Sequence, residues 1–329
     1  RPRTRRAQWR KAVLMKLFVS RPLPDAVLAA ANAAFDLTVR PSNAPMSDGE
    51  MIAALQEHDI LIPTLGDRFQ PPVFAAVPRP RARLLANFGV GTNHIDVAAA
   101  QAAGIAVTNT PGAVTDATAD IALTLMLMSA RRAAEGERLV RAGQWQGWHP
   151  TQMLGLHLTG KTLGIVGMGR IGQAIARRAH FGFEMPVLYH TRSPRDLPFA
   201  TPVADLRALM AASDVVVIAV PASPQTHHLI DAAALAAMRP HAHLVNIARG
   251  DIIDEAALIA ALQQGRIAGA GLDVYEFEPQ VPQALRDLPN VTLLPHLGTA
   301  ALEVRTGMGL MALDNALAFQ QGRALPNAV

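Results

Sequence analysis

Three ionisable side chains in the second half of the sequence are of types that can bind an anion and transfer a proton. Arg249, Glu278 and His296 each follow an apolar run that predicts a strand. One chemistry that they fit is hydride transfer to a 2-oxo acid, which requires a cation for the carboxylate and carbonyl, an acid that protonates the developing alkoxide, and a partner that keeps this acid charged. Taken singly, each residue has a structural alternative, as a helix cap, a loop acid or a buried histidine.

A glycine-rich segment indicates the hydride carrier. It follows the apolar run 163–166 and opens a helix near residue 171. In a GxGxxG pattern with this context, the first glycine permits a tight turn, the second lets the backbone approach a pyrophosphate, and the third lets helix and strand pack closely. The helix N-terminus presents amides and a positive dipole end to the phosphates. The predicted dinucleotide site therefore includes Gly167, Met168, Gly169, Arg170, Ile171 and Gly172.

The end of the next predicted strand bears on the choice between NAD and NADP. An acid about twenty residues beyond the glycine loop would bond the ribose hydroxyls, but the residues here are Thr191, Arg192 and Ser193. Arg192 can pair with a 2′-phosphate. The sequence therefore favours NADP(H), with NAD(H) possible. The alternative is that Arg192 is a solvated residue that stacks on adenine.

The elements that must position these groups alternate between short apolar runs and helix-like stretches from Lys16 onward, which is typical of parallel sheets covered by helices. Five strands are expected first, near residues 17–19, 35–39, 60–63, 84–87 and 106–109. Six more are expected at 162–166, 187–190, 215–219, 243–246, 269–272 and 291–294. The predicted fold class is α/β with two doubly wound domains.

A break at Asn109-Thr110-Pro111-Gly112 separates the two sets of strands. The segment 117–129 after it predicts a helix that is buried on nearly all sides. A last helix near 301–319 is expected to return to the first domain. The predicted domains are a substrate-binding domain at 15–110 and 299–329, and a dinucleotide-binding domain at 111–298. Residues 1–14 are predicted to be a disordered basic tail outside the fold.

Length and composition restrict the class of protein. A chain of 329 residues with 50% hydrophobic and 17% charged residues is typical of two well-packed domains. The absence of cysteine excludes disulfides and thiolate metal sites, and no metal is expected. Neither an apolar run of about 20 residues nor a signal pattern is present, so we expect a cytoplasmic protein without a membrane partner.

The formal net charge of +4 does not indicate a nucleic-acid partner. Six of the positive charges lie within residues 1–11, with no acid among them, so the rest of the chain is slightly acidic. No nucleic-acid partner is therefore expected for the folded part. A functional basic arm at residues 1–11 is the alternative.

Further motifs occur in one order along the chain. They are Asn87-Phe88-Gly89-Val90-Gly91, Asn109 to Asp120, the glycine loop, Asn246 to Gly250, Gly271 to Val274, Glu278-Pro279 and Pro295-His296. Together they resemble the D-isomer-specific 2-hydroxyacid dehydrogenases over nearly all of the chain after Met15, and most closely the NADPH-dependent glyoxylate/hydroxypyruvate reductases of that family. The resemblance implies a Rossmann cofactor domain inserted into a flavodoxin-like substrate-binding domain.

The resemblance also implies roles for particular residues. Arg249 would bind and polarise the substrate, His296 would be the general acid in reduction, and Glu278 would pair with the histidine. The amides of Val90 and Gly91 would hold the substrate carboxylate. The cofactor site would further include Thr115, Val220, Pro221, Thr226, Ile247, Ala248 and Asp273, the last of these orienting the nicotinamide end.

The segment Gly147-Trp148-His149-Pro150 is similar to one in glyoxylate/hydroxypyruvate reductases, where the tryptophan reaches the partner subunit's active site and limits substrate size. This implies a homodimer in which Trp148 binds substrate across the interface. The alternative is a core or interface tryptophan. The implied reactions are reduction of glyoxylate to glycolate and of hydroxypyruvate to D-glycerate.

Two other functions stay open at this point. One is a dehydrogenase of the same family that acts on phosphoglycerate, formate or a bulkier 2-oxo acid. The other is a dinucleotide-sensing interaction protein of the same fold, similar to transcriptional corepressors. Such a protein would be expected to bind peptides, and beyond the basic tail no segment suggests a peptide partner.

Overall fold

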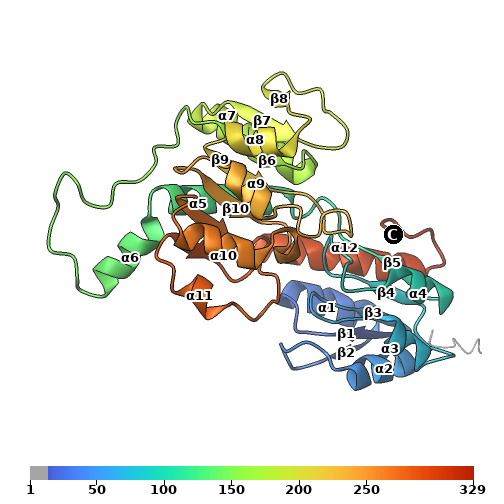
Figure 1. The fold of residues 1–329 in the computed structure, drawn as a ribbon. Coiled ribbons are helices and arrows are strands. Elements are labelled where there is room, and N and C mark those ends of the chain that lie inside the picture. The colour runs from blue at the N-terminus through green and yellow to red at the C-terminus, as the bar shows by residue number, and fades with distance from the viewer. Residues whose placement is uncertain (1–13) are drawn as a thin grey trace, which may run out of the picture. The chain divides into compact units, whose positions relative to one another are not determined.

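The computed structural model describes residues 14–329, so the predicted tail lies outside the described residues except for Leu14. The chain forms two compact units. The first comprises the described residues up to Ala113 together with Leu302–Val329, and the second is Val114–Ala301. Each unit contains its own parallel sheet with helices packed on it (Figure 1).

The first unit contains a five-stranded parallel sheet in the order β2-β1-β3-β4-β5, which is the flavodoxin-like order. Its strands are β1 (Lys16–Val19), β2 (Asp36–Val39), β3 (Ile60–Ile62), β4 (Leu84–Ala86) and β5 (Ala106–Thr108). Its helices are α1 (Asp25–Ala34), α2 (Asp48–Glu57), α3 (Pro71–Ala75), α4 (Val97–Ala102) and α12 (Leu302–Gln320). The inner strands are apolar and fully buried, as expected when helices cover both faces of a parallel sheet.

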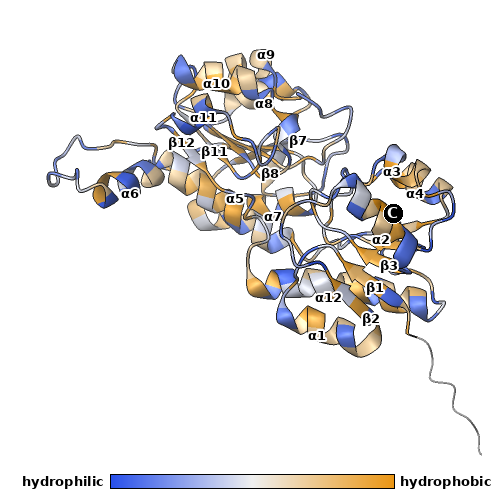
Figure 2. Ribbon diagram, turned by 90° about the horizontal axis from the view of Figure 1, so that it is seen from below, coloured by the Kyte–Doolittle hydropathy of each residue, from blue (hydrophilic) through white to orange (hydrophobic). Residues whose placement is uncertain are grey.

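The last helix, α12, packs against α1 and β4 of the same unit. A glycine allows this close approach, because a Cβ at Gly309 would lie 2.6 Å from a methyl group of Val27. Figure 2 shows apolar residues along β1 and β3, which lie in this unit's core. The chain therefore closes the core of its first unit with its last helix.

The second unit contains a seven-stranded parallel sheet in the order β12-β11-β10-β9-β6-β7-β8. Its strands are β6 (Leu163–Val166), β7 (Val187–His190), β8 (Ala200–Pro202), β9 (Val215–Ile218), β10 (His243–Asn246), β11 (Gly269–Leu272) and β12 (Val291–Leu293). Its helical segments are α5 (Thr115–Ala130), α6 (Ala133–Arg141), α7 (Arg170–Phe183), α8 (Leu206–Ala212), α9 (Ala232–Ala237), η1 (Gly250–Ile252), α10 (Glu255–Gln263) and α11 (Gln283–Arg286).

The sequence predicts six strands in this part of the chain, and the structure has one more. β8 pairs with β7 at the edge of the sheet, contains Pro202 and has no buried residue. An exposed edge strand needs no apolar run, and its proline is tolerated there because one side of the strand has no partner. The strand therefore gives no apolar signal in the sequence.

The helix α5 differs in part from its prediction. Half of its residues are buried between α7 and the sheet, but a stripe at about four-residue spacing faces outward. Asp116 and Asp120 of this stripe pair with Arg178 of α7, at 3.0 and 2.8 Å. The helix is thus not buried on nearly all sides.

Within residues 14–329, no helix is long and apolar enough to cross a bilayer.

A buried polar pair joins α5 to β10. The Nδ1 atom of His243 lies 2.8 Å from Oγ of Ser129, and the histidine is only 5% exposed. Burial lowers the pKa of His243 to about 4, and the neighbouring His241 acts in the same direction. The folded protein therefore holds this imidazole neutral at pH values where an unfolded chain would protonate it.

We expect this pair to make the protein sensitive to acid between pH 6.5 and about 4. In that window the unfolded chain binds a proton that folded His243 does not, so stability falls as the pH falls, by roughly 3 kcal/mol over the window. Urea unfolding at pH 7 and pH 4 should show a smaller loss for His243→Asn than for the wild type. His157→Asn, at an exposed position, serves as the control, and equal losses in all three proteins would contradict the prediction.

Candidate active site

The predicted glycine loop joins β6 to α7. Gly167 has φ +102°, and a Cβ there would lie 2.7 Å from the backbone carbonyl of Ala219. A Cβ at Gly172 would overlap the carbonyl of Gly167. Gly169, by contrast, caps α7, and a Cβ there would meet nothing within 4 Å. The first and third glycines are thus required by the protein's own packing, whereas the second leaves open surface at a helix N-terminus, which fits a pyrophosphate group.

The predicted 2′-phosphate site follows β7. Thr191 is partly exposed, and Arg192 and Ser193 are exposed. The loop is fixed nearby by buried Tyr189, whose hydroxyl accepts from the amide of Arg195 at 2.9 Å and donates to its carbonyl at 2.8 Å. No ion pair or hydrogen bond involves the Arg192 guanidinium within residues 14–329. The loop therefore presents a cation to solvent where many dinucleotide sites present an acid.

The other predicted cofactor residues lie in the second unit, mostly in loops after its strands. Val220, Pro221 and Thr226 follow β9, Ile247 and Ala248 follow β10, Asp273 follows β11, and Thr115 is the first residue of α5. The hydroxyl of Thr226 bonds its own loop, donating to the carbonyl of Pro221 at 2.8 Å. Because the sheet is parallel, the loops that follow β6, β7, β9, β10 and β11 emerge at one edge of it.

Arg249 is held by the turn that follows β10. Asn246, the last residue of that strand, accepts a hydrogen bond from the amide of Ala248 at 3.0 Å and donates to the carbonyl of Arg249 at 2.8 Å. A Cβ at Gly250 would overlap the backbone of Tyr275, so the turn packs directly on the loop that leads to Glu278.

The guanidinium of Arg249 keeps its positive charge although it is buried. Burial lowers the pKa of its guanidinium, and the nearby charges of Glu278 and Asp251 oppose that shift. Nη1 donates to the carbonyl of Ala248 at 2.7 Å. Because an arginine begins from a very high pKa, it stays a cation near neutral pH.

Glu278 and His296 form a direct pair. Oε2 of Glu278 lies 2.9 Å from Nδ1 of His296, and Oε1 accepts from the amide of Tyr275 at 3.0 Å. Burial alone would raise the pKa of Glu278, but the hydrogen bond and charge of His296, the Tyr275 amide and Arg249 together lower it below its ordinary value. An ionised carboxylate only accepts, so Nδ1 carries a proton and Nε2 is the ring nitrogen that can exchange one with a ligand.

The loop that carries His296 is anchored by Asp273, which is 1% exposed. Its two carboxylate oxygens accept from the amides of Leu297 at 2.6 Å and Gly298 at 2.8 Å. His296 itself has φ +55°, a conformation that is rare for a side chain of this size. The predicted contact of Asp273 with the nicotinamide stays a prediction, and the bonds observed are those that hold the loop.

Burial also raises the pKa of Asp273, with the charge of Glu278 acting in the same direction. The amides of Leu297 and Gly298 and the charge of His296 oppose the shift. Desolvation is thus only partly offset by these hydrogen bonds.

The predicted substrate-binding residues lie apart in the chain. Val90 and Gly91 follow β4 in the first unit, with Val90 39% exposed. Trp148 belongs to the second unit, in the segment after α6, and is 80% exposed. α6 has no buried residue, and it projects with the following segment away from the seven-stranded sheet (Figure 1). Trp148 therefore does not belong to a core formed by the described residues.

Sequence reasoning gave no role to three residues that shape this site. Asn246 fixes the Arg249 turn, Tyr275 donates its amide to Glu278, and Thr118 donates its hydroxyl to the carbonyl of Gly298 at 3.2 Å. The signal for Asn246 is a polar residue that ends a buried apolar strand. Thr118 gives no comparable signal, because its partner lies 180 positions away.

Among residues 14–329, no cluster of histidine and acidic side chains is suited to hold a metal.

The chain matches known proteins over most of its length. The family model for the D-isomer specific 2-hydroxyacid dehydrogenase NAD binding domain matches residues 123–298. A glyoxylate reductase of Thermococcus kodakarensis is 42% identical over 321 residues, covering 95% of this chain and 96% of the relative. A glycerate dehydrogenase of Hyphomicrobium methylovorum is 38% identical, covering 91% of this chain and 94% of the relative.

A solved structure agrees with these relatives. The NADPH-dependent glyoxylate/hydroxypyruvate reductase from Sinorhizobium meliloti, in complex with NADP and malonate, has a TM-score of 0.85 and 36% identity, with 96% of each chain covered. A protein from Thermus thermophilus has a TM-score of 0.89 and 41% identity, covering 96% of this chain and 100% of that one.

A Rossmann-type sheet with a glycine loop, matched by an NAD-binding family model, defines this protein as an NAD(P)-dependent oxidoreductase. The chain belongs to the D-isomer-specific 2-hydroxyacid dehydrogenase family. The predicted resemblance and fold class are therefore confirmed, and the relatives support 2-hydroxyacid dehydrogenase activity.

The Glu278–His296 pair should also affect stability in acid. Because the pKa of folded Glu278 lies below its ordinary value of 4.5, its stabilising contribution is fully present above pH 4.5 and is lost as the pH falls through the folded value. Glu278→Gln should lower stability at pH 7 by about 1 kcal/mol. Urea unfolding from pH 7 to pH 3 should show a weaker acid dependence for this variant.

Glu303→Gln, which removes an exposed carboxylate elsewhere, is the matched control. It should reproduce the wild-type pH dependence. An unchanged acid dependence in Glu278→Gln would show that the pair does not stabilise the folded protein.

Proposed function

We propose that this protein uses NADPH to reduce small 2-oxo acids, converting glyoxylate to glycolate and hydroxypyruvate to D-glycerate. The observation that carries the proposal is the 2.9 Å hydrogen bond between Glu278 and His296, with Arg249 near enough to lower the pKa of that glutamate. The names of the relatives support the same substrates, since they include a glyoxylate reductase and a glycerate dehydrogenase.

In the proposed reaction, the bound nicotinamide supplies a hydride to the carbonyl carbon of the substrate. Arg249 binds the substrate carboxylate and polarises the carbonyl, so that negative charge can develop on its oxygen. His296 delivers the proton from Nε2 to that oxygen. Glu278 stabilises the protonated imidazole until transfer, and the histidine regains its proton from solvent afterwards.

The NADPH preference rests on the loop after β7. Arg192 is exposed and makes no ion pair within the described residues, and no acid occupies positions 191–193. A guanidinium binds phosphate with charge-assisted hydrogen bonds. The reductase from Sinorhizobium meliloti was solved with NADP, which supports the same preference here.

We also propose that the protein is a homodimer and that its two units bind different ligands. Residues 111–298 would bind the dinucleotide, and residues 15–110 with 299–329 would bind the substrate. The projecting α6 segment exposes Trp145 (53%), Trp148 (80%) and Leu154 (68%), which is unusual for a surface that faces only water. By the resemblance to glyoxylate/hydroxypyruvate reductases, we propose that these side chains are buried against a second copy, with Trp148 at the partner's substrate site.

Replacement of His296 tests the mechanism. His296→Ala should lower kcat for glyoxylate by about 10²- to 10⁴-fold, because the proton donor is lost. The Kd of NADPH, followed by its fluorescence, should change little. His157→Ala, which removes an exposed histidine, should keep wild-type turnover. A kcat for His296→Ala equal to that of the wild type would rule out His296 as the proton donor.

Replacement of Arg192 tests the cofactor preference. Arg192→Ala should raise the KM for NADPH about tenfold or more and leave the KM for NADH nearly unchanged, because only NADPH carries the 2′-phosphate. Arg195→Ala, three positions later in the same exposed loop, is the control. Equal KM values for NADPH in the wild type and Arg192→Ala would refute the assignment.

A further inference from the structure

The turn after β4 has its backbone carbonyls bound by side-chain amides. Nδ2 of Asn87 donates to the carbonyls of Gly89 and Gly91, each at 3.0 Å. Nδ2 of Asn109, which follows β5, donates to the carbonyl of Val90 at 2.9 Å. Three consecutive carbonyls are therefore fixed by two asparagines from neighbouring strands.

Because these carbonyls are held in place, the orientation of the N–H group in each of the same peptide units is fixed as well. In a trans peptide the C=O and N–H groups point in opposite directions. The carbonyl of Gly89 is thus coupled to the N–H of Val90, and the carbonyl of Val90 to the N–H of Gly91. Within residues 14–329, neither of these amides donates to an acceptor. Successive outward amides form a concave site for an anion.

Asn87 is itself held in one orientation. It is fully buried, and its Oδ1 lies 2.9 Å from Nε2 of His94, a histidine that is 6% exposed. Because the two Nδ2 hydrogens of Asn87 are used by carbonyls, Oδ1 is the acceptor in this contact and His94 is the donor. The histidine therefore prevents the amide group from flipping, which would place an oxygen against two carbonyls.

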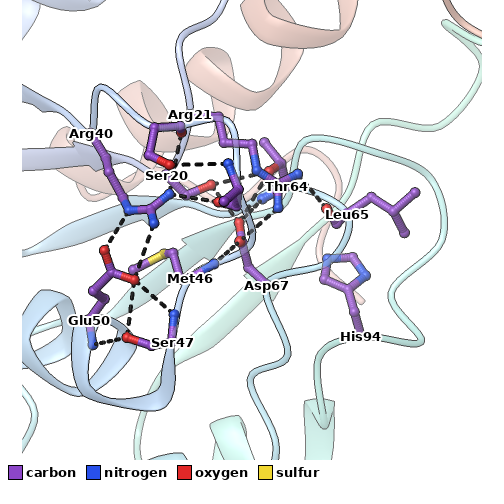
Figure 3. Close-up of polar contacts among 12 residues, drawn as sticks. Ser20, Arg21, Arg40, Met46, Ser47, Glu50, Thr64, Leu65, Asp67 and His94 are labelled. Carbon is purple, nitrogen blue, oxygen red and sulfur yellow. Dashed lines mark hydrogen bonds and ion pairs between the residues drawn. The ribbon is translucent and has the colours of Figure 1, made fainter. Parts of the chain in front are cut away.

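The neighbouring loop does not repel an anion. Phe88 of the turn donates its amide to the carbonyl of Pro63, so the β3 loop lies beside it. The carboxylate in that loop, Asp67, is fully buried and pairs with Arg21 at 3.2 Å (Figure 3). Asp67 also accepts from the hydroxyl of Ser20 at 2.6 Å and from two backbone amides. Its charge is therefore compensated within the protein.

We propose that Asn87 and Asn109 are positioning residues that hold the amides of Val90 and Gly91 ready for the carboxylate of a 2-oxo acid. The proposal rests on the proposed function for the identity of the anion. Because the asparagines order the turn before substrate binds, binding does not incur the entropy cost of ordering it. The asparagines touch no reacting atom, so they should affect substrate binding much more than the chemical step.

The test replaces each asparagine by serine, which is neutral and too short to reach the carbonyls. Asn109→Ser and Asn87→Ser should raise the KM for glyoxylate and the inhibition constant of oxalate about tenfold or more. In the same variants kcat should change less than about threefold, and the Kd of NADPH should stay constant. The control is Asn290→Ser, because Asn290 also donates to one backbone carbonyl, that of Ala268 at 3.2 Å.

The possible results distinguish a failure of this proposal from a failure of the proposed function. Wild-type KM and oxalate inhibition in the Asn109→Ser variant would overturn the proposal, as would an equal rise in Asn290→Ser. If Asn87→Ser does not fold, Asn109→Ser decides alone. If the wild type reduces no 2-oxo acid, the proposed function fails, and oxalate binding measured by calorimetry decides this proposal. Weaker oxalate binding in Asn109→Ser supports it, whereas equal binding or none by the wild type overturns it.

Discussion

A buried carboxylate determines how the candidate active site is built. Asp273 follows β11 and has almost no contact with water, and it uses both oxygens to hold the two amides that follow His296. A desolvated carboxylate is costly unless it is hydrogen-bonded, so these bonds resist any movement of the loop. The left-handed backbone of His296 is kept in place by the same bonds, and its imidazole is thereby directed to Glu278.

A similar arrangement occurs at two other loops, one in each sheet. A polar residue at or just after the end of a buried strand binds the backbone of the turn that follows. Asn246 does so for Arg249, and Asn87 does so for Gly89 and Gly91. Each turn is thus anchored to a rigid strand by a short side chain, and the groups that face a ligand are positioned by residues that do not face it.

The fold could be predicted from sequence wherever strands are buried. Runs such as Val215–Ile218 are apolar without interruption because helices cover both faces of the sheet. β8 was not predicted because it lies exposed at an edge. The outward stripe of α5 was not predicted because Asp120 is the only charged residue in segment 117–129. The residues after the strands predict a chemistry for the site, which stays a prediction. The anchoring bonds of Asp273 and Asn109 could not be predicted, since their partners lie about twenty positions away and meet only in the folded chain.

The position of α12 has a consequence for the order in which the chain folds. This helix packs on α1 and β4, yet the entire second unit separates it from them in the sequence. The inserted unit has been synthesised before α12 leaves the ribosome. Until then, the face of the first sheet that α1 and α12 cover together is only partly covered. Such long-range closure slows folding. The dinucleotide-binding unit is therefore expected to acquire its structure first, and the last helix to complete the first unit as a late and separate event.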